Sequence, residues 1–297
     1  MAARLRLTFL VDNRAGRSGL IAEHGLSVLV ETEDARILFD TGQGAALAPN
    51  AEALGADLGN VHALVFSHGH YDHTGGLAAA LQRNRLARLY LHPAAAAPKY
   101  ARSQAPPHRE IGMPAPCREA LRTAMERVVW NRNAVEIAPG VTATGEIPRP
   151  AAAEAGRFFL DPSCQRPDPF VDEQALMIET PRGLVVLTGC AHAGLPATLG
   201  WCRRLSGGRR VFAVFGGFHL AAATDQELES AAEALESSGA EVIGPCHCTG
   251  ARGYGFLRSR FGGRVIEPEC GFVWEYSERE RGAAGGLAAS APEVEQE

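Results

Sequence analysis

Residues 67–73 (SHGHYDH) carry three imidazoles and one carboxylate within a single short string. They follow directly on an apolar-rich run, residues 61–66 (VHALVF), which is typical of a strand. Because alternate side chains of an extended chain share a face, His68 and His70 can point at one metal ion. The turn that follows can direct Asp72 and His73 toward a second. Neutral imidazoles with a carboxylate suit zinc, iron or manganese, so the string predicts a metal centre.

More histidines follow later strand-like segments, each in a loop that also contains glycine: His192, His219 and His247. Binding residues concentrate on loops that a rigid scaffold holds in place. We therefore expect His192 and His247 to join the metal centre. His219 could bind metal, contact substrate or support another ligand. His24 lies in a compact polar turn, for which a structural hydrogen bond is the favoured interpretation.

Three cysteines stand close to these histidines in the sequence. Cys190 lies two residues before His192, so its thiol could approach the metal. Cys246 and Cys248 flank His247, and in an extended segment both would point away from its ring. We therefore expect packing roles for these last two thiols.

The elements that must position these residues can be predicted from hydrophobic patterning. The first half predicts a strand at 5–11, a strand pair at 26–30 and 36–39, helices near 50–54 and from 74, and a strand at 89–92. The second half predicts a hairpin at 175–179 and 184–187, strands at 210–215, 241–243 and 272–274, and a helix around 256–261. A further helix begins at Thr224, which forms a capping box with Glu227, and ends at Gly239. In each half of the chain, consecutive strands come first, and strands that alternate with helices follow. This order indicates β-sheets that are covered by layers of helices.

Residues 94–172 are the least regular part of the chain and are rich in proline. Proline removes a backbone donor and breaks regular elements, and long segments without periodicity are usually functional or mobile. We interpret 94–172 as an insertion over the metal centre, within a single domain that spans 1–277. The tail, 278–297, has no apolar periodicity and is predicted to be disordered.

Composition limits the function classes further. The chain has 297 residues, of which 46% are hydrophobic and 21% charged, as in an ordinary globular protein with a large core. A net charge of −5 gives no electrostatic basis for binding nucleic acid. The sequence contains no apolar run long enough for a membrane helix, and its N-terminus lacks signal-peptide features, so we expect a cytoplasmic protein without a membrane partner. The seven cysteines are odd in number and irregularly spaced, which argues against a disulfide framework.

The H-x-H-x-D-H pattern in 67–73, with residues 40–42 (DTG) before it and 189–192 (GCAH) after it, resembles the metallo-β-lactamase superfamily. The resemblance covers nearly the whole chain, residues 5–276. Additional strings resemble the branch labelled dihydropterin-methyl-ribofuranosyl-aminobenzene 5′-phosphate synthase-like. These strings are GGL at 75–77, GCAHAG at 189–194, GGFHL at 216–220 and HCTG at 247–250.

The resemblance implies an α/β (α+β) fold, the four-layer αβ/βα sandwich, with the irregular insertion added and a binuclear site at the sheet edge. It implies that Asp40 buttresses the histidine loop. The implied ligands are His68, His70 and His192 for the first metal, and Asp72, His73 and His247 for the second. Many members carry a bridging aspartate before the last histidine motif, but this chain has no carboxylate between His219 and Asp225. Either His219 substitutes in part, or the second metal is weaker or absent.

Two divalent ions about 3.5–4 Å apart can hold a hydroxide and clamp both oxygens of a displacement. We expect zinc, with manganese or iron as alternatives, and a small-molecule substrate that is phosphorylated or pterin-like. Asp72 would orient the hydroxide, and His219 would donate a hydrogen bond to an oxyanion or a phosphate oxygen. Arg102 or Arg109 could neutralise a phosphate, although a solvated surface position is favoured for both. A mononuclear iron dioxygenase and a non-enzymatic ligand-sensing protein of the same fold are the alternatives to a metal-dependent hydrolase.

Overall fold

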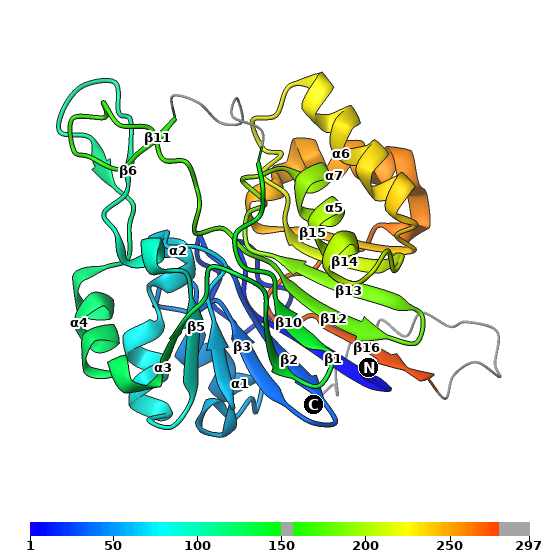
Figure 1. Cartoon of the computed structure of the whole chain (residues 1–297), viewed down its shortest axis with the longest axis horizontal. Coiled ribbons are helices and arrows are strands. Elements are labelled where there is room, and N and C mark those ends of the chain that lie inside the picture. Colours follow the sequence, from blue (N-terminus) through cyan, green and yellow to red (C-terminus); the bar gives the residue numbers. More distant parts are fainter. Residues whose placement is uncertain (150–156, 279–297) are drawn as a thin grey trace.

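Two large β-sheets stack face to face (Figure 1), in a computed structural model that describes residues 1–149 and 157–278. The first sheet has the strand order β16 (Val273–Ser277), β1 (Arg4–Val11), β2 (Ser27–Thr32), β3 (Arg36–Phe39), β4 (Ala63–Val65), β5 (Arg88–Leu91) and β8 (Val128–Trp130). The second has the order β15 (Val242–Cys246), β14 (Val211–Gly217), β13 (Gly183–Thr188), β12 (Leu176–Thr180), β10 (Val141–Ala143) and β9 (Val135–Ala138).

Helices cover the outer face of each sheet. The first sheet packs against α1 (Leu47–Ala53), α3 (Leu77–Arg83) and α4 (Ala115–Thr123), and the second against α5 (Leu195–Leu205), α6 (Asp225–Ser238) and α7 (Gly250–Phe261). Short 3-10 turns complete the connections: η1 (Leu58–Asn60), η2 (Pro93–Ala96), η3 (Met125–Arg127), η4 (His247–Thr249) and η5 (Gly262–Arg264). The resulting αβ/βα layering confirms the predicted fold class.

Side-chain alternation along the strands builds this layering. In β1, Leu5, Leu7 and Phe9 point into the core between the two sheets, whereas Leu10 belongs to the core beneath the helices of the first sheet. The Phe9 ring lies 6.1 Å from the ring of Phe215 on β14, across the sheet interface. From Leu7 to Val11 both faces of β1 are therefore buried, whereas Arg4 and Arg6 at its start are exposed.

The helix predicted to begin at Thr224 is confirmed as α6. The Thr224 side chain accepts from the backbone N–H of Glu227, whose carboxylate accepts from the Thr224 N–H at 2.6 Å. Gly239 ends the helix in a left-handed conformation with φ +83°. The buried stripe includes the predicted Leu228, Ala231, Ala232 and Leu235.

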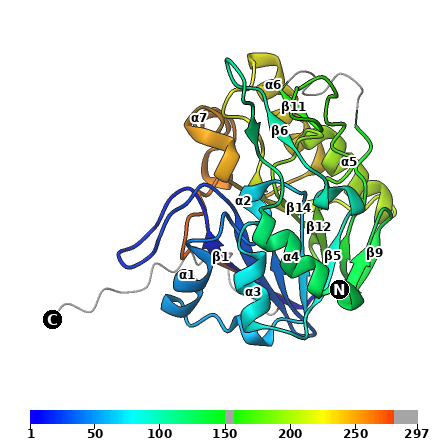
Figure 2. The same ribbon diagram turned by 90° about the vertical axis from the view of Figure 1, so that its left-hand side faces the viewer.

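The segment 94–172 contains more regular structure than its proline content suggested. β8, β9, β10 and α4 all lie within it and join the two main layers. A separate small sheet is formed by β11 (Phe158–Phe159), β6 (Tyr100–Ala101) and β7 (Arg109–Glu110). Figure 2 shows β6 and β11 standing beyond the edge of the large sheets, above α2 (Tyr71–Thr74). Strands of two to four residues leave too short a pattern to be recognised in the sequence.

Strand direction brings the histidine loops to one edge. β3, β4 and β5 run parallel in the first sheet, and β13, β14 and β15 run parallel in the second. The loops that follow β4, β13, β14 and β15 therefore leave from corresponding ends of their sheets. Among the described residues, no helix combines the length and apolar character needed to cross a membrane. Apart from Glu278, the tail predicted to be disordered lies outside the described residues, as do residues 150–156.

Candidate metal centre

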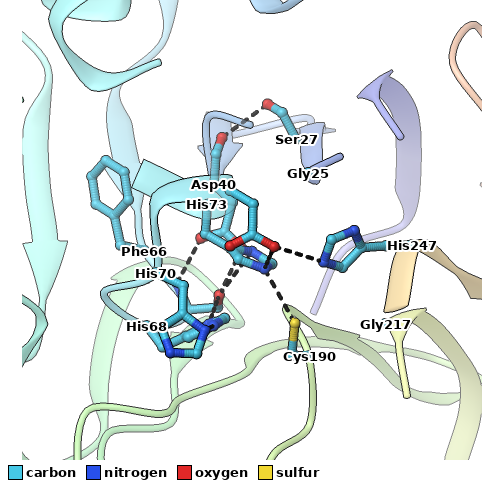
Figure 3. Close-up of polar contacts among 12 residues, drawn as sticks. Gly25, Ser27, Asp40, Phe66, His68, His70, His73, Cys190, Gly217 and His247 are labelled. Carbon is cyan, nitrogen blue, oxygen red and sulfur yellow. Dashed lines mark hydrogen bonds and ion pairs between the residues drawn. The ribbon is translucent and has the colours of Figure 1, made fainter. Parts of the chain in front are cut away.

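Asp40 holds the histidine loop in place from the end of β3. Its carboxylate accepts hydrogen bonds from the Ser67 backbone N–H at 2.7 Å and from the Ser67 hydroxyl at 2.6 Å. The same carboxylate lies 2.7 Å from Nδ1 of His73. Asp40 is fully buried and adopts a left-handed backbone with φ +57°. These contacts give Asp40 the supporting position that the resemblance implied (Figure 3).

The first cluster contains His68, His70 and His192, whose ligand atoms all lie within 4.8 Å of one another. The Nε2 atom of His68 lies 3.0 Å from Nδ1 of His70, and the Ser67 hydroxyl lies 2.9 Å from Nδ1 of His68. All three rings are buried. The structure thus brings together the three residues predicted for the first metal.

The second cluster is centred on Oδ2 of Asp72. This oxygen lies 3.3 Å from Nε2 of His247 and 3.7 Å from Nε2 of His73. The three residues predicted for the second metal are therefore neighbours. Nε2 of His24 also lies 3.2 Å from Asp72 Oδ2, and the side chain of His24 is half exposed. His24, for which a structural hydrogen bond was favoured, reaches the mouth of this cluster.

Two residues directly after β1 orient His247, and neither was predicted from the sequence. Asp12 accepts the backbone N–H of His247 at 2.8 Å. The Asn13 Oδ1 atom lies 2.9 Å from His247 Nδ1, so a ring that donates there turns its Nε2 atom toward Asp72. Their position directly after a strand end was the signal, since the other site loops share it.

The loop of His192 is held by Glu173, another residue that was not predicted from the sequence. The buried carboxylate of Glu173 accepts the backbone N–H groups of His192 and Ala193. Phe170 stacks on the His192 ring with centroids 4.2 Å apart and an angle of 26°. Phe158 of β11 lies 5.5 Å from the same ring, so the small sheet contributes an aromatic wall to the site. No sequence pattern linked Glu173 to this loop.

His219 lies beside the first cluster. Its ring centroid is 4.5 Å from that of His192, and it forms a group of potential ligands with Cys190 and His192. It adopts a left-handed backbone with φ +51° and is partly exposed.

The expectation that Cys248 points away from His247 was wrong. Cys248, His247 and Cys190 form one group whose ligand atoms lie within 4.8 Å of one another. The extended segment ends at Cys246, and the chain then turns into η4 with φ +49° at His247, so strand alternation no longer applies. Burial raises the pKa of the Cys248 thiol, but the hydrogen bond from Cys190 and the nearby imidazoles outweigh it and hold that pKa well below its usual value.

Electrostatics favour the metal-binding forms of His68, His70 and Asp72, whereas at His73 burial is outweighed by the carboxylates of Asp40 and Asp72, which raise the pKa of the ring. Burial, with a further contribution from neighbouring imidazoles, holds the pKa values of His68 and His70 well below the usual value, so both rings are neutral at pH 7. Burial by itself would raise the pKa of Asp72, but His73, His24 and His247 hold it well below its usual range. Neutral imidazoles that face one another, an ionised carboxylate and nearby thiols form a donor set that fits divalent transition metals.

The layered fold and the two-cluster site define the class of this protein. The sequence model of the metallo-beta-lactamase superfamily matches residues 20–247, and the chain belongs to that superfamily. Its members are mostly metal-dependent hydrolases.

Among particular relatives, the chain is similar to the 7,8-dihydropterin-6-methyl-4-(beta-D-ribofuranosyl)-aminobenzene-5′-phosphate synthase of Methanocaldococcus jannaschii. The two are 29% identical over 281 residues, which cover 86% of this chain and 92% of the relative. The match confirms the predicted resemblance to that branch.

Solved structures give the same result. Tm1679, described as a metal-dependent hydrolase of the beta-lactamase superfamily, superposes with a TM-score of 0.76 at 32% identity, covering 92% of this chain and 99% of that one. Zn²⁺-bound PqqB from Methylobacterium extorquens has a TM-score of 0.57 at 14% identity, covering 90% of this chain and 99% of that one. The second likeness shows the fold alone.

Proposed function

We propose that this chain is a metal-dependent hydrolase that binds two divalent cations, zinc in the first instance, and acts on a small phosphorylated or pterin-like molecule. The observation that carries the proposal is the convergence of two buried ligand clusters at one sheet edge. His68, His70 and His192 would hold one cation, and Asp72, His73 and His247 the other. Two such cations supply a hydroxide nucleophile at neutral pH and polarise the bond under attack.

Two residues of the chain, Asp72 and His219, would act on the substrate beside the cations. Asp72 lies at the centre of the second cluster, where its carboxylate can orient the attacking oxygen and accept its proton. His219 lies beside His192 and is partly exposed, so it can donate a hydrogen bond to an oxyanion or phosphate oxygen.

Two observations support the substrate class: the similarity to a synthase whose name contains a dihydropterin and a 5′-phosphate, and one arginine near the second cluster. The Arg109 guanidinium lies 5.6 Å from the ring centroid of Tyr71, next to Asp72 in sequence, and its residue is exposed. It can therefore meet a substrate phosphate. Arg102 is less suited, because its guanidinium stacks 4.4 Å from the Phe159 ring and donates to the Cys164 carbonyl at 2.9 Å.

The proposal can be tested on full-length protein purified without chelators. Elemental analysis should find zinc at about two ions per chain. Hydrolysis rates should be measured on a phosphomonoester, a phosphodiester and a lactone before chelation, after chelation and after zinc is restored. We expect turnover of a phosphate ester that disappears with the metal and returns with it. Turnover that survives metal removal would contradict the proposal, as would one iron per chain with oxygen consumption, which the dioxygenase alternative expects.

Replacing His219 by alanine should lower kcat by about 100-fold, the effect of removing one oxyanion donor, while the metal content stays unchanged. Rates and elemental analysis on the same samples provide the measurement. His62→Ala is the matched control, since His62 precedes β4 at the opposite end of that strand and accepts the Arg36 backbone N–H. If His219→Ala loses metal and activity in the same proportion, His219 is a ligand rather than a substrate contact.

A further inference from the structure

The sulfur of Cys190 lies among potential ligands of both metal positions. It forms one group with His68 and His73, a second with His192 and His219, and a third with His247 and Cys248, each within 4.8 Å. Sγ of Cys190 is 3.2 Å from Nε2 of His73, and the residue is buried (Figure 3). Cys190 is therefore adjacent to residues assigned to the first cation and to residues assigned to the second.

The carboxylate expected between the two cations is missing at its usual place in the sequence. The first acidic residue after His219 is Asp225, whose side chain is 95% exposed and pairs with Arg252 at 2.5 Å. Asp225 begins α6 and faces solvent, so it cannot serve as a ligand shared by the clusters. The site needs another anion in the middle if two dications are to lie close together.

Glycines at the ends of β13 and β14 allow the cysteine loop to approach the histidine loop. A Cβ on Gly189 would lie 2.0 Å from the Ser67 hydroxyl oxygen, and a Cβ on Gly217 would lie 2.5 Å from Sγ of Cys248. Any larger residue at Gly189 would push Cys190 away from the loop that carries His68. The close approach of the sulfur is thus built into the backbone.

We infer that the Cys190 thiolate is the ligand shared by the two cations and takes the place of the missing carboxylate. The inference rests on the proposed two-cation function. As sulfur–metal bonds form, the S–H bond breaks and its proton leaves to solvent, so metal binding at this site releases a proton. A thiolate favours zinc, iron or cadmium over manganese or magnesium, and the site should discriminate accordingly.

Cys248 is the weaker candidate for this role by position. Without metal it is the more acidic of the two thiols, because burial and then the hydrogen bond to Cys248 raise the pKa of Cys190 well above its usual value, so a bound cation must displace the Cys190 proton. It shares a ligand group only with His247 and Cys190, whereas Cys190 also joins His68, His73 and His192. The Cys248 sulfur accepts the His219 backbone N–H at 3.3 Å, which ties it to the outer side of the cluster. We therefore expect Cys248 to be dispensable for binding both cations.

The test is cadmium-113 NMR of the full chain, loaded to saturation with cadmium alone. Sulfur ligands move a cadmium resonance far downfield of the range for nitrogen and oxygen ligands. A shared thiolate therefore predicts two downfield resonances in the wild-type protein, both of which move upfield in Cys190→Ala. Cys248→Ala should keep both resonances downfield. Cys202→Ala is the matched control, because Cys202 is equally buried but lies in α5, away from the site.

Each outcome separates the inference from the proposed function. Two wild-type resonances in the nitrogen and oxygen range overturn the inference without requiring any variant to fold. The inference also fails if only one resonance, or neither, moves in Cys190→Ala, while the two-cation function stands. If the wild-type chain binds no cadmium or zinc, the proposed function itself fails.

Discussion

Asp72→Ala and His68→Ala are each expected to remove most of the bound metal and to lower kcat by more than about 100-fold, since even residues that merely support a ligand cost 10- to 100-fold. Asp72 contributes the only carboxylate of the second cluster, and its loss leaves His73 and His247 without the anion between them. His68 faces His70 across 3.0 Å in the first cluster. Elemental analysis and steady-state rates on the purified variants provide the measurement.

Both variants should remain folded, because neither side chain belongs to the three hydrophobic cores. Far-ultraviolet circular dichroism checks this point. Asp225→Ala is the control, since it removes an equally charged but exposed carboxylate. Unchanged metal stoichiometry in both site variants would refute the ligand assignment.

Lys99→Met should lower the free energy of unfolding by about 3–5 kcal/mol, the usual result of leaving buried charges without their partner. Lys99, the only lysine of the chain, is buried and lies 2.6 Å from Asp168 and 3.0 Å from Asp172. Both carboxylates are also buried. Urea unfolding followed by circular dichroism measures the loss.

Arg122→Met is the control, because the Arg122–Glu119 pair is exposed and its removal should leave the unfolding midpoint unchanged. Unaltered stability of Lys99→Met would show that the buried ion pairs contribute nothing. Metal content should fall as well, since Asp172 also accepts the Gly69 backbone N–H at 2.8 Å and so holds the histidine loop.

The ion pairs of Lys99 also determine in which direction folding stability changes with pH. Burial opposes ionisation of Asp172, but Lys99 outweighs it and lowers the pKa of that carboxyl. The contribution of ionised Asp172 to folding stability is therefore present above the pKa of about 4 that the carboxyl has in the unfolded chain. That contribution is lost as the pH falls through the lower pKa that the carboxyl has in the folded protein. Burial likewise opposes the charge on Lys99, yet the two aspartates raise its pKa, so its contribution is lost only as the pH rises through that raised value.

The residues of the two clusters, which we propose as metal ligands, could be named from the sequence because their signals are local. The spacing of His68, His70, Asp72 and His73 lies within one short string, and strand-end positions identified His192 and His247. The capping box of α6 is equally local. Each of these patterns spans only a few residues, and backbone geometry alone fixes how residues so close in sequence lie relative to one another.

The residues that hold those ligands could not be predicted in the same way. Asn13 meets His247, and Glu173 meets the His192 loop, only after the two sheets have stacked. Cys248 was misplaced because a left-handed residue interrupts the strand just before it. Within 94–172, short strands pair with strands that are distant in the sequence, and no local sequence pattern predicts such pairing.

The left-handed backbone found at Asp40, His219 and His247 has a consequence for how mutations spread through this protein. Non-glycine residues in that conformation cost on the order of 1–3 kcal/mol each, and they persist only where the surroundings over-determine them. The sheet edge that carries the proposed site therefore stores backbone strain. Substitutions that replace large apolar side chains of the core by smaller ones should shift these turns before they unfold the chain. Activity should therefore fall before the folded structure is lost.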